Sequence, residues 1–209
     1  YNNIKKVGLP QWSAEDQLLA KATQIELKAP KIEGLATKLD TLGLPSPTGS
    51  VNVMGRQLMA MGGGSDDIAD ISWSLPTVVL RYPSNIPGLP GHHWSNAISM
   101  ATPIAHKGIV YGAKAEVMTL LDMLLKPEII KNAWEYYRTE QTKELQYTPL
   151  VGEKDHPAIY LNEKIMKEYA PKLKATYYNP AKYKTYLEQL GIAYPTLRPD
   201  QKEAVGKLK

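Results

Sequence analysis

Apolar residues recur at helical spacing in the first part of the chain. In residues 13–28 they fall on one helical face, at Leu18, Leu19, Ala22 and Ile25. Ser13, with Asp16 three residues later, has the spacing of an N-terminal cap, and Pro30 ends the pattern. The sequence therefore predicts a capped amphipathic helix over 13–28.

A second helical pattern runs from Pro103 to Leu125. Its apolar positions are spaced as in a helix that packs on a sheet. Pro127 suits a first-turn position and opens a further helix through Trp134 and Tyr137.

Between these patterns the sequence favours strand and loop. Residues 77–82 are β-branched and apolar, lie between Pro76 and Pro83, and are typical of a buried strand. Residues 43–64 are rich in Gly, Pro and Ser and predict a loop around a short strand near 51–54. Proline and glycine after residue 82 predict a loop without helix until about Thr102. The pattern as a whole predicts an α/β fold, a mixed sheet flanked by helices, with a helical C-terminal tail.

The tail differs in composition from the rest of the chain. Residues 154–209 hold 11 Lys or Arg against 6 Asp or Glu, with seven tyrosines among them. One interpretation is a solvated helical appendage whose lysine stems cover apolar surface. The other is a contact with nucleic acid or another anionic surface. Acidic residues interrupt the lysines throughout, so we do not expect nucleic-acid binding.

Composition limits the chemistry. The chain has 209 residues, 43% of them hydrophobic, and a formal net charge of +4 that does not define a partner. It has no cysteine, so a metal would be held by histidine and carboxylate.

No apolar run approaches the ~20 residues that span a bilayer, so we expect no membrane span. Tyr1 opens the chain without an initiator Met, and we expect sequence to precede it, which leaves a cytoplasmic or exported location open.

Three histidines are candidates for chemistry. His92 and His93 follow the predicted strand, where ligands gather in open α/β sheets, and are either metal ligands or hydrogen-bonded loop elements. His106 lies in the first turn of the helix at Pro103, where the helix dipole disfavours imidazolium. A neutral ring there could accept a proton or contact a ligand, or simply form a hydrogen bond at the helix start.

Three carboxylates, Asp66, Asp67 and Asp70, follow the glycine run 62–64. Asp66 and Asp67 could complete a zinc or manganese shell or orient an imidazole through its second nitrogen. Alternatively, Ser65 or Asp66 caps a short helical turn. Neither a phosphate-binding glycine loop nor a Gly-x-Ser-x-Gly elbow is present, so nucleotide and serine-hydrolase chemistry have no motif support.

Five segments taken together resemble a known family. They are, in chain order, Val7–Gln17, Gly64–Asp67, the predicted strand 77–82, Gly91–Trp94 and Ile104–Gly108. Their order and spacing resemble the zinc-dependent aminoacylase and carboxypeptidase-G-like metallohydrolases, in the p-aminobenzoyl-glutamate hydrolase-like branch. The resemblance covers roughly residues 1–150.

The resemblance implies the C-terminal half of a catalytic domain over 1–150, with a helical, basic, Tyr-rich extension over 151–209. It implies an amidohydrolase that cleaves N-acyl or N-aroyl amino acids with a water activated by two metal ions, zinc or alternatively manganese or cobalt. His92 takes the place of a metal ligand. Asp66, Asp67, His93 and His106 take places that shape the substrate pocket or support the ligands.

The chain also departs from the family pattern. It contains no His-x-Asp ligand motif and no adjacent Glu-Glu pair with the general base. We therefore expect no catalytic residue in this chain, and an N-terminal half and a lid domain as its partners, with a homo-oligomer when complete. The alternative is a non-catalytic scaffold or partner subunit of the same fold.

Overall fold

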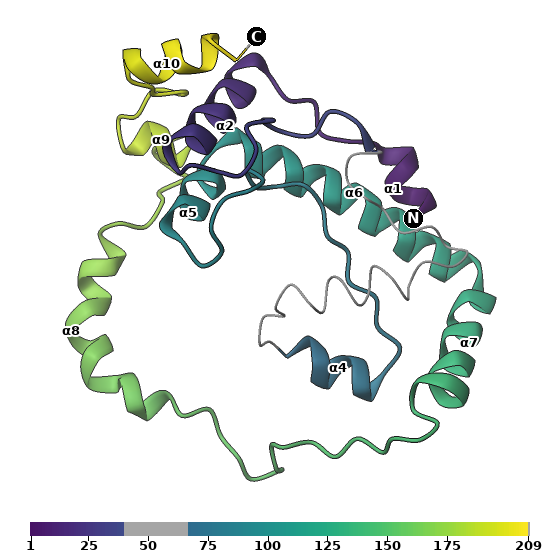
Figure 1. The fold of residues 1–209 in the computed structure, drawn as a ribbon. Helices are drawn as coiled ribbons and strands as arrows, with labels where there is room; N and C mark the ends of the chain where they lie inside the picture. Colours follow the sequence, from purple (N-terminus) through teal and green to yellow (C-terminus); the bar gives the residue numbers. More distant parts are fainter. Residues whose placement is uncertain (40–66, 209) are drawn as a thin grey trace. The chain divides into compact units, whose positions relative to one another are not determined.

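A computed structural model describes residues 1–39 and 67–208. These residues fold into helices joined by loops (Figure 1). The elements are α1 (Asn2–Val7), α2 (Ala14–Glu26), α4 (Ile68–Ser74), α5 (Trp94–Met100), α6 (Pro103–Leu125), α7 (Pro127–Tyr136), the π-helical turn η2 (Tyr137–Gln141), the 3-10 turn η3 (Ile159–Asn162), α8 (Glu163–Lys174), α9 (Tyr186–Gln189) and α10 (Pro199–Gly206).

The chain divides into two compact units. Unit 1 comprises Tyr1–Leu145 and Tyr194–Lys209, and unit 2 comprises Gln146–Ala193. Unit 1 holds a small core of buried side chains, with partly buried rings packed against it. The buried members are Leu19, Ala20, Leu35, Ile86 and Ile104, and the packed neighbours are Trp12, Leu89, Tyr194 and Leu197.

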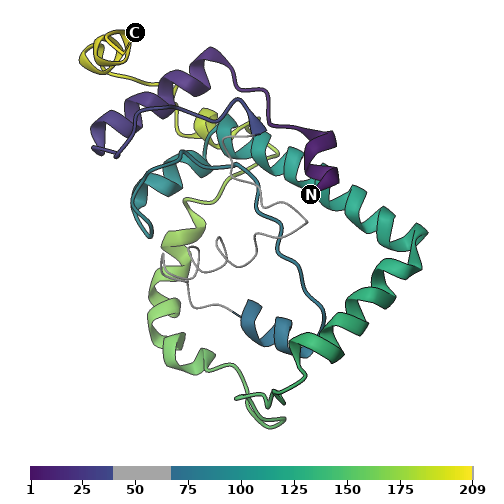
Figure 2. The ribbon, with the colours of Figure 1, turned by 45° about the vertical axis from the view of Figure 1, so that its right-hand side comes forward.

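Helix α6 is the longest element of unit 1, and α1 lies against it in both views (Figures 1 and 2). Asn3 joins the two helices, because its amide donates to the Thr119 hydroxyl (3.1 Å) and to Asp122 (2.9 Å). Near the other end of α6, Gly108 allows the backbone of residues 83–84 to approach the helix closely. A Cβ there would lie 2.3 Å from the carbonyl oxygen of Pro83. The glycine is thus required by the contact between α6 and the segment 83–84.

Polar side chains of α2 bind the neighbouring loops. Gln24 is buried, accepts from the Gly34 amide (2.8 Å) and donates to the Pro87 carbonyl (3.0 Å). Gln17 exchanges two hydrogen bonds with the backbone of Leu35, at 2.8 and 2.9 Å. The buried Gln24 and the partly buried Gln17 thus fix the loops on α2 by hydrogen bonds.

The predicted α/β fold is wrong for the described residues, which contain helices and no strand. The run 77–82 lies in a segment, 76–84, without helix, turn or bend. Its backbone forms no hydrogen bond to the described part of the chain, and Val78 is 80% exposed. β-branched residues favour an extended backbone, but a strand also needs a neighbour with which to pair. The expected strand at 51–54 lies outside the described residues.

Three predicted helices are confirmed as α2, α6 and α7. Helix α6 does not pack on a sheet in the described residues; α1, α5 and α7 contact it instead. Helix α5 falls where a loop was expected. Its formation is explained by the end of the proline and glycine run at Gly91 and by His93, which caps the helix.

Apolar side chains of α6 remain exposed. Val117, Leu120 and Leu124 are spaced by three or four residues, and Val110 lies seven residues before Val117, so all four share one face of the helix. They are between 51% and 77% exposed. This face has no core beneath it within the described residues of unit 1.

Unit 2 contains no buried residue. Its C-terminal part is held by polar contacts around α9. The Gln189 side chain accepts from the Asn179 amide (2.7 Å) and donates to the Tyr177 carbonyl (3.0 Å), and Tyr178 packs edge to face on Tyr186. Ile165, Tyr169 and Leu173 of α8 lie on one helical face, and all three are about half exposed. None of the helices in the described ranges combines the length and the apolar character needed to cross a bilayer.

Candidate functional site

The histidine loop ends at the N-terminus of α5, where the two rings have different surroundings. The Nδ1 atom of His93 lies 2.9 Å from the Ser95 hydroxyl and accepts from the Ser95 amide at 3.3 Å. A ring that accepts at Nδ1 carries its proton on Nε2 when neutral, so neither nitrogen of His93 has a free lone pair. His92 is exposed and has a φ of +51°. Its ring forms no hydrogen bond within the described residues, which leaves both nitrogens accessible.

The other predicted site residues lie on separate elements. Asp67 is exposed and precedes α4 without a side-chain cap, and His106 is exposed in the first turn of α6. Asp66 and Ser65 lie outside the described residues. Across 1–39 and 67–208, no group of three or more His, Asp or Glu side chains could hold a metal ion. His92 therefore belongs to no group of three potential ligands in the described part of the chain.

A buried polar junction forms between α2, α6 and the C-terminal segment. Asp16 is fully buried at the start of α2. Its Oδ2 accepts from the Ser13 amide (2.8 Å) and from Lys107 Nζ (2.5 Å), and its Oδ1 accepts from the Tyr194 hydroxyl (2.6 Å). Each oxygen of the buried carboxylate is thus paired with a donor.

The junction shifts two ionisation equilibria. Burial by itself raises the pKa of the Asp16 carboxyl, but hydrogen bonds from Lys107, Tyr194 and the Ser13 backbone outweigh burial and hold the pKa below its usual value. Burial, followed by the hydrogen bond to the Asp16 carboxylate, raises the pKa of Tyr194 far above its usual value. Asp16 is therefore a carboxylate and Tyr194 a neutral donor at pH 7.

This junction was only partly visible in the sequence. The spacing of Ser13 and Asp16 predicts the cap, and the structure confirms a reciprocal capping box. Lys107 and Tyr194 lie 91 and 178 residues from Asp16, so local pattern could not identify them. The junction joins two of the resembling segments, Val7–Gln17 and Ile104–Gly108. It fixes the first turn of α6, which carries His106.

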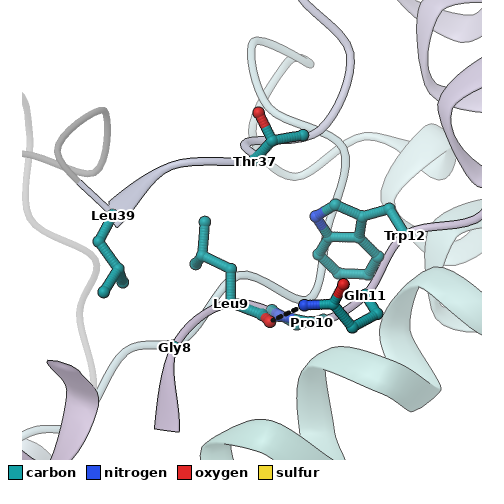
Figure 3. A pocket seen from close by; sticks show the side chains of 7 residues that line it. All are labelled: Gly8, Leu9, Pro10, Gln11, Trp12, Thr37 and Leu39. Carbon is teal, nitrogen blue, oxygen red and sulfur yellow. Dashed lines mark hydrogen bonds between the residues drawn. The ribbon is translucent and has the colours of Figure 1, made fainter. Parts of the chain in front are cut away.

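A cavity of about 370 Å³ opens beside Trp12 (Figure 3). Its lining residues are Gly8, Leu9, Pro10, Gln11, Trp12, Thr37 and Leu39, none of which is ionisable. The indole Nε1 of Trp12 donates to the Ala36 carbonyl at 2.9 Å, which fixes the ring at one wall. The Tyr82 hydroxyl donates to the carbonyl of Gly8, which is one of the lining residues.

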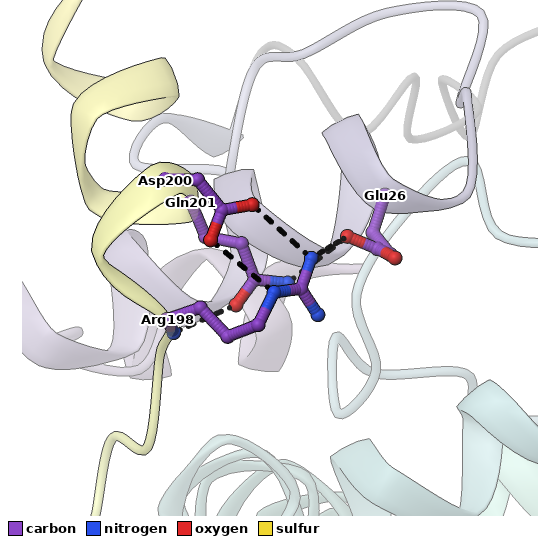
Figure 4. Close-up of polar contacts among 4 residues, drawn as sticks. All are labelled: Glu26, Arg198, Asp200 and Gln201. Atoms are coloured by element: carbon purple, nitrogen blue, oxygen red, sulfur yellow. Dashed lines mark hydrogen bonds and ion pairs between the residues drawn. The ribbon is translucent and has the colours of Figure 1, made fainter.

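The C-terminal segment is also attached to α2 at the surface (Figure 4). The Arg198 guanidinium donates to Glu26 at 2.9 Å and lies 3.2 Å from Asp200, and the Gln201 amide donates to the same Glu26 oxygen at 3.0 Å. Hydrogen bonds from Gln201 and Arg198 lower the pKa of Glu26. These groups are about half exposed or more, so each pair contributes little to stability compared with the buried junction.

Comparison with known proteins gives one informative relative. No family model matches the chain, and no solved structure matches it. One of the subunits of the p-aminobenzoyl-glutamate hydrolase of Escherichia coli (strain K12) is 22% identical to the chain. The alignment covers 72% of the chain and 34% of the relative, so the chain spans about a third of the length of the curated relative that it matches. The similarity supports a distant, family-level link to a hydrolase subunit.

Proposed function

We propose that this chain is one part of a metal-dependent amidohydrolase that cleaves the amide bond of N-acyl or N-aroyl amino acids, with p-aminobenzoyl-glutamate-like compounds as substrates. The observation that carries the proposal is the similarity to the Escherichia coli hydrolase subunit. That relative's name supplies the substrate class.

The described residues do not form a metal site by themselves, so no step of hydrolysis is assigned to them. His92 is the side chain that we propose as a ligand, because it is exposed and both ring nitrogens are accessible. The remaining ligands and the general base would come from polypeptide outside this chain. Zinc suits histidine and carboxylate ligands, and manganese or cobalt are the alternatives.

A second polypeptide also suits the exposed surface of unit 1. The apolar face of α6 and the unpaired segment 76–84 expose Val and Leu side chains that a complete catalytic domain would cover. We propose that an N-terminal half of the domain and a lid domain supply this cover. We also propose that the assembly forms a homo-oligomer.

The test is a native purification. The chain is tagged at its C-terminus at its own chromosomal locus, and the purified material is examined by intact mass, metal analysis and hydrolysis of p-aminobenzoyl-glutamate. We expect polypeptide beyond 23.3 kDa, about two metal ions per copy of the tagged chain, and turnover. A metal-free 23.3 kDa chain with no turnover contradicts the proposal.

Histidine variants of the complete assembly test the ligand. His92→Ala should remove one metal ion and lower kcat by about 100-fold or more without unfolding the protein. His93→Ala should retain the metal, since its Nδ1 is engaged by Ser95. His156→Ala, also exposed, is the matched control. Unchanged metal content and turnover in His92→Ala would exclude the assignment.

The second candidate function is a non-catalytic scaffold or partner subunit. The observation that favours it is that no metal-binding group of three side chains exists in the described ranges. A tagged assembly that holds stoichiometric partner polypeptide but no metal and no amidase activity would establish this candidate instead.

A further inference from the structure

One side of the cavity beside Trp12 is held in place by burial and hydrogen bonding. Leu9 and Pro10 are buried, and the Trp12 ring is fixed by its hydrogen bond to Ala36 and by packing on the core of unit 1. A wall that is already ordered loses little conformational entropy when a ligand binds. The volume, about 370 Å³, is in the range of small-molecule sites and at its lower end.

The lining of the cavity offers polar and apolar surface in similar amounts. Leu9, Trp12 and Leu39 supply the apolar and aromatic part around one space (Figure 3). A flat ring gains both burial and favourable stacking geometry against an indole. Because no lining side chain among the described residues is ionisable, a charged ligand would lose hydration without gaining a counter-charge from them.

Two polar side chains of the lining have donors or acceptors that are not paired with any described residue. The Thr37 hydroxyl forms no hydrogen bond to the described residues. The Gln11 amide donates to the Leu9 carbonyl at 3.5 Å, and its oxygen has no donor. A ligand with an N–H donor and a C=O acceptor would pair with both groups.

We infer that the cavity lined by Leu9, Trp12, Thr37 and Leu39 is a binding site for an uncharged aromatic amide. The ring lies against Trp12, and the amide reaches Gln11 and Thr37. This inference rests on the cavity alone and does not depend on the proposed hydrolase function, so either can fail without the other.

The test uses the ¹⁵N-labelled 209-residue chain and three probes. Benzamide has the ring and the neutral amide, benzoate replaces the amide with a charge, and cyclohexanecarboxamide keeps the amide without the aromatic ring. The readout is the indole N–H resonance of Trp12. It is assigned by its absence in Trp12→Phe. We expect a saturating shift with benzamide at a dissociation constant of about 1–10 mM. Benzoate should bind at least about tenfold more weakly, and cyclohexanecarboxamide should bind more weakly than benzamide.

A variant that leaves the walls intact keeps the test decisive. Thr37→Val preserves shape and exposure and should weaken benzamide binding about threefold to tenfold. Thr77→Val, outside the cavity lining, is the matched control and should bind as the parent chain does. Equal shifts with benzamide and benzoate, no saturation of the Trp12 resonance, or an unaltered Thr37→Val affinity would each overturn the inference.

Discussion

The buried junction at Asp16 allows a stability effect to be worked out from contacts. The perturbation is Asp16→Asn, which keeps the size of the side chain and removes its charge. Three donors, from Ser13, Lys107 and Tyr194, lose a carboxylate acceptor. Hydrogen bonds to a charged group contribute about 1.5–3 kcal/mol each.

Two effects reduce this loss. The neutral amide keeps one acceptor oxygen, and it removes the several kcal/mol that desolvation of a carboxylate costs. The Lys107 side chain is one third exposed, so we expect its ion pair with Asp16 to contribute at the low end of this energy range. We therefore expect Asp16→Asn to lower the free energy of unfolding by about 2–4 kcal/mol, with a fall in Tm of about 5–15 °C.

The assay is urea unfolding followed by circular dichroism, with a double-mutant cycle between Asp16→Asn and Tyr194→Phe. The cycle should give a coupling of about 1 kcal/mol or more, because the two side chains share a hydrogen bond. Asp200→Asn, the same change at an exposed carboxylate, should stay within about 0.5 kcal/mol of the parent chain. The reasoning is refuted when Asp16→Asn is no more destabilising than this control.

Three further outcomes are expected. The pKa of Asp16 is lower in the folded than in the unfolded chain, so its contribution to stability is complete above about pH 4 and is lost as the pH falls further. Acid unfolding of the parent chain, compared with that of Asp16→Asn, checks this. Because the pKa of Tyr194 is raised by folding, its contribution is complete below about pH 10 and is lost at higher pH; alkaline unfolding of Tyr194→Phe should lack this loss, and an unchanged profile argues against it. Gly108→Ala should destabilise unit 1 by about 1–3 kcal/mol in thermal unfolding, because the added Cβ meets the Pro83 backbone. In the control Gly206→Ala the Cβ enters open space, so this change should be neutral or slightly stabilising. Equal effects of the two substitutions would disprove the contact.

The sequence predicted the elements whose signals are local. Helix α6 begins at Pro103 as expected, because proline is favoured in a first turn and the apolar spacing continues to Leu125. The Ser13 cap is equally local. Helix α5 was missed because a seven-residue helix gives almost no periodic signal, and its cap is a histidine, which is uncommon at that position.

Features that depend on distant partners could not be predicted. Residues 77–82 have the composition of a strand, yet pairing depends on a neighbour that local pattern does not reveal. In the site, the contact of His93 with the Ser95 hydroxyl and amide is local, and it was missed because histidine is an uncommon helix cap. Lys107 and Tyr194 meet Asp16 only through the tertiary fold.

The exposed run from Val78 to Leu80 has a consequence for the life of the chain in a cell. Chaperones bind extended apolar segments, and such segments also promote aggregation when they are exposed. A copy of the chain that remains uncovered there is therefore open to degradation or precipitation, while a covered copy is shielded. We expect the steady-state abundance of this chain to follow the supply of whatever shields these residues rather than its own rate of synthesis.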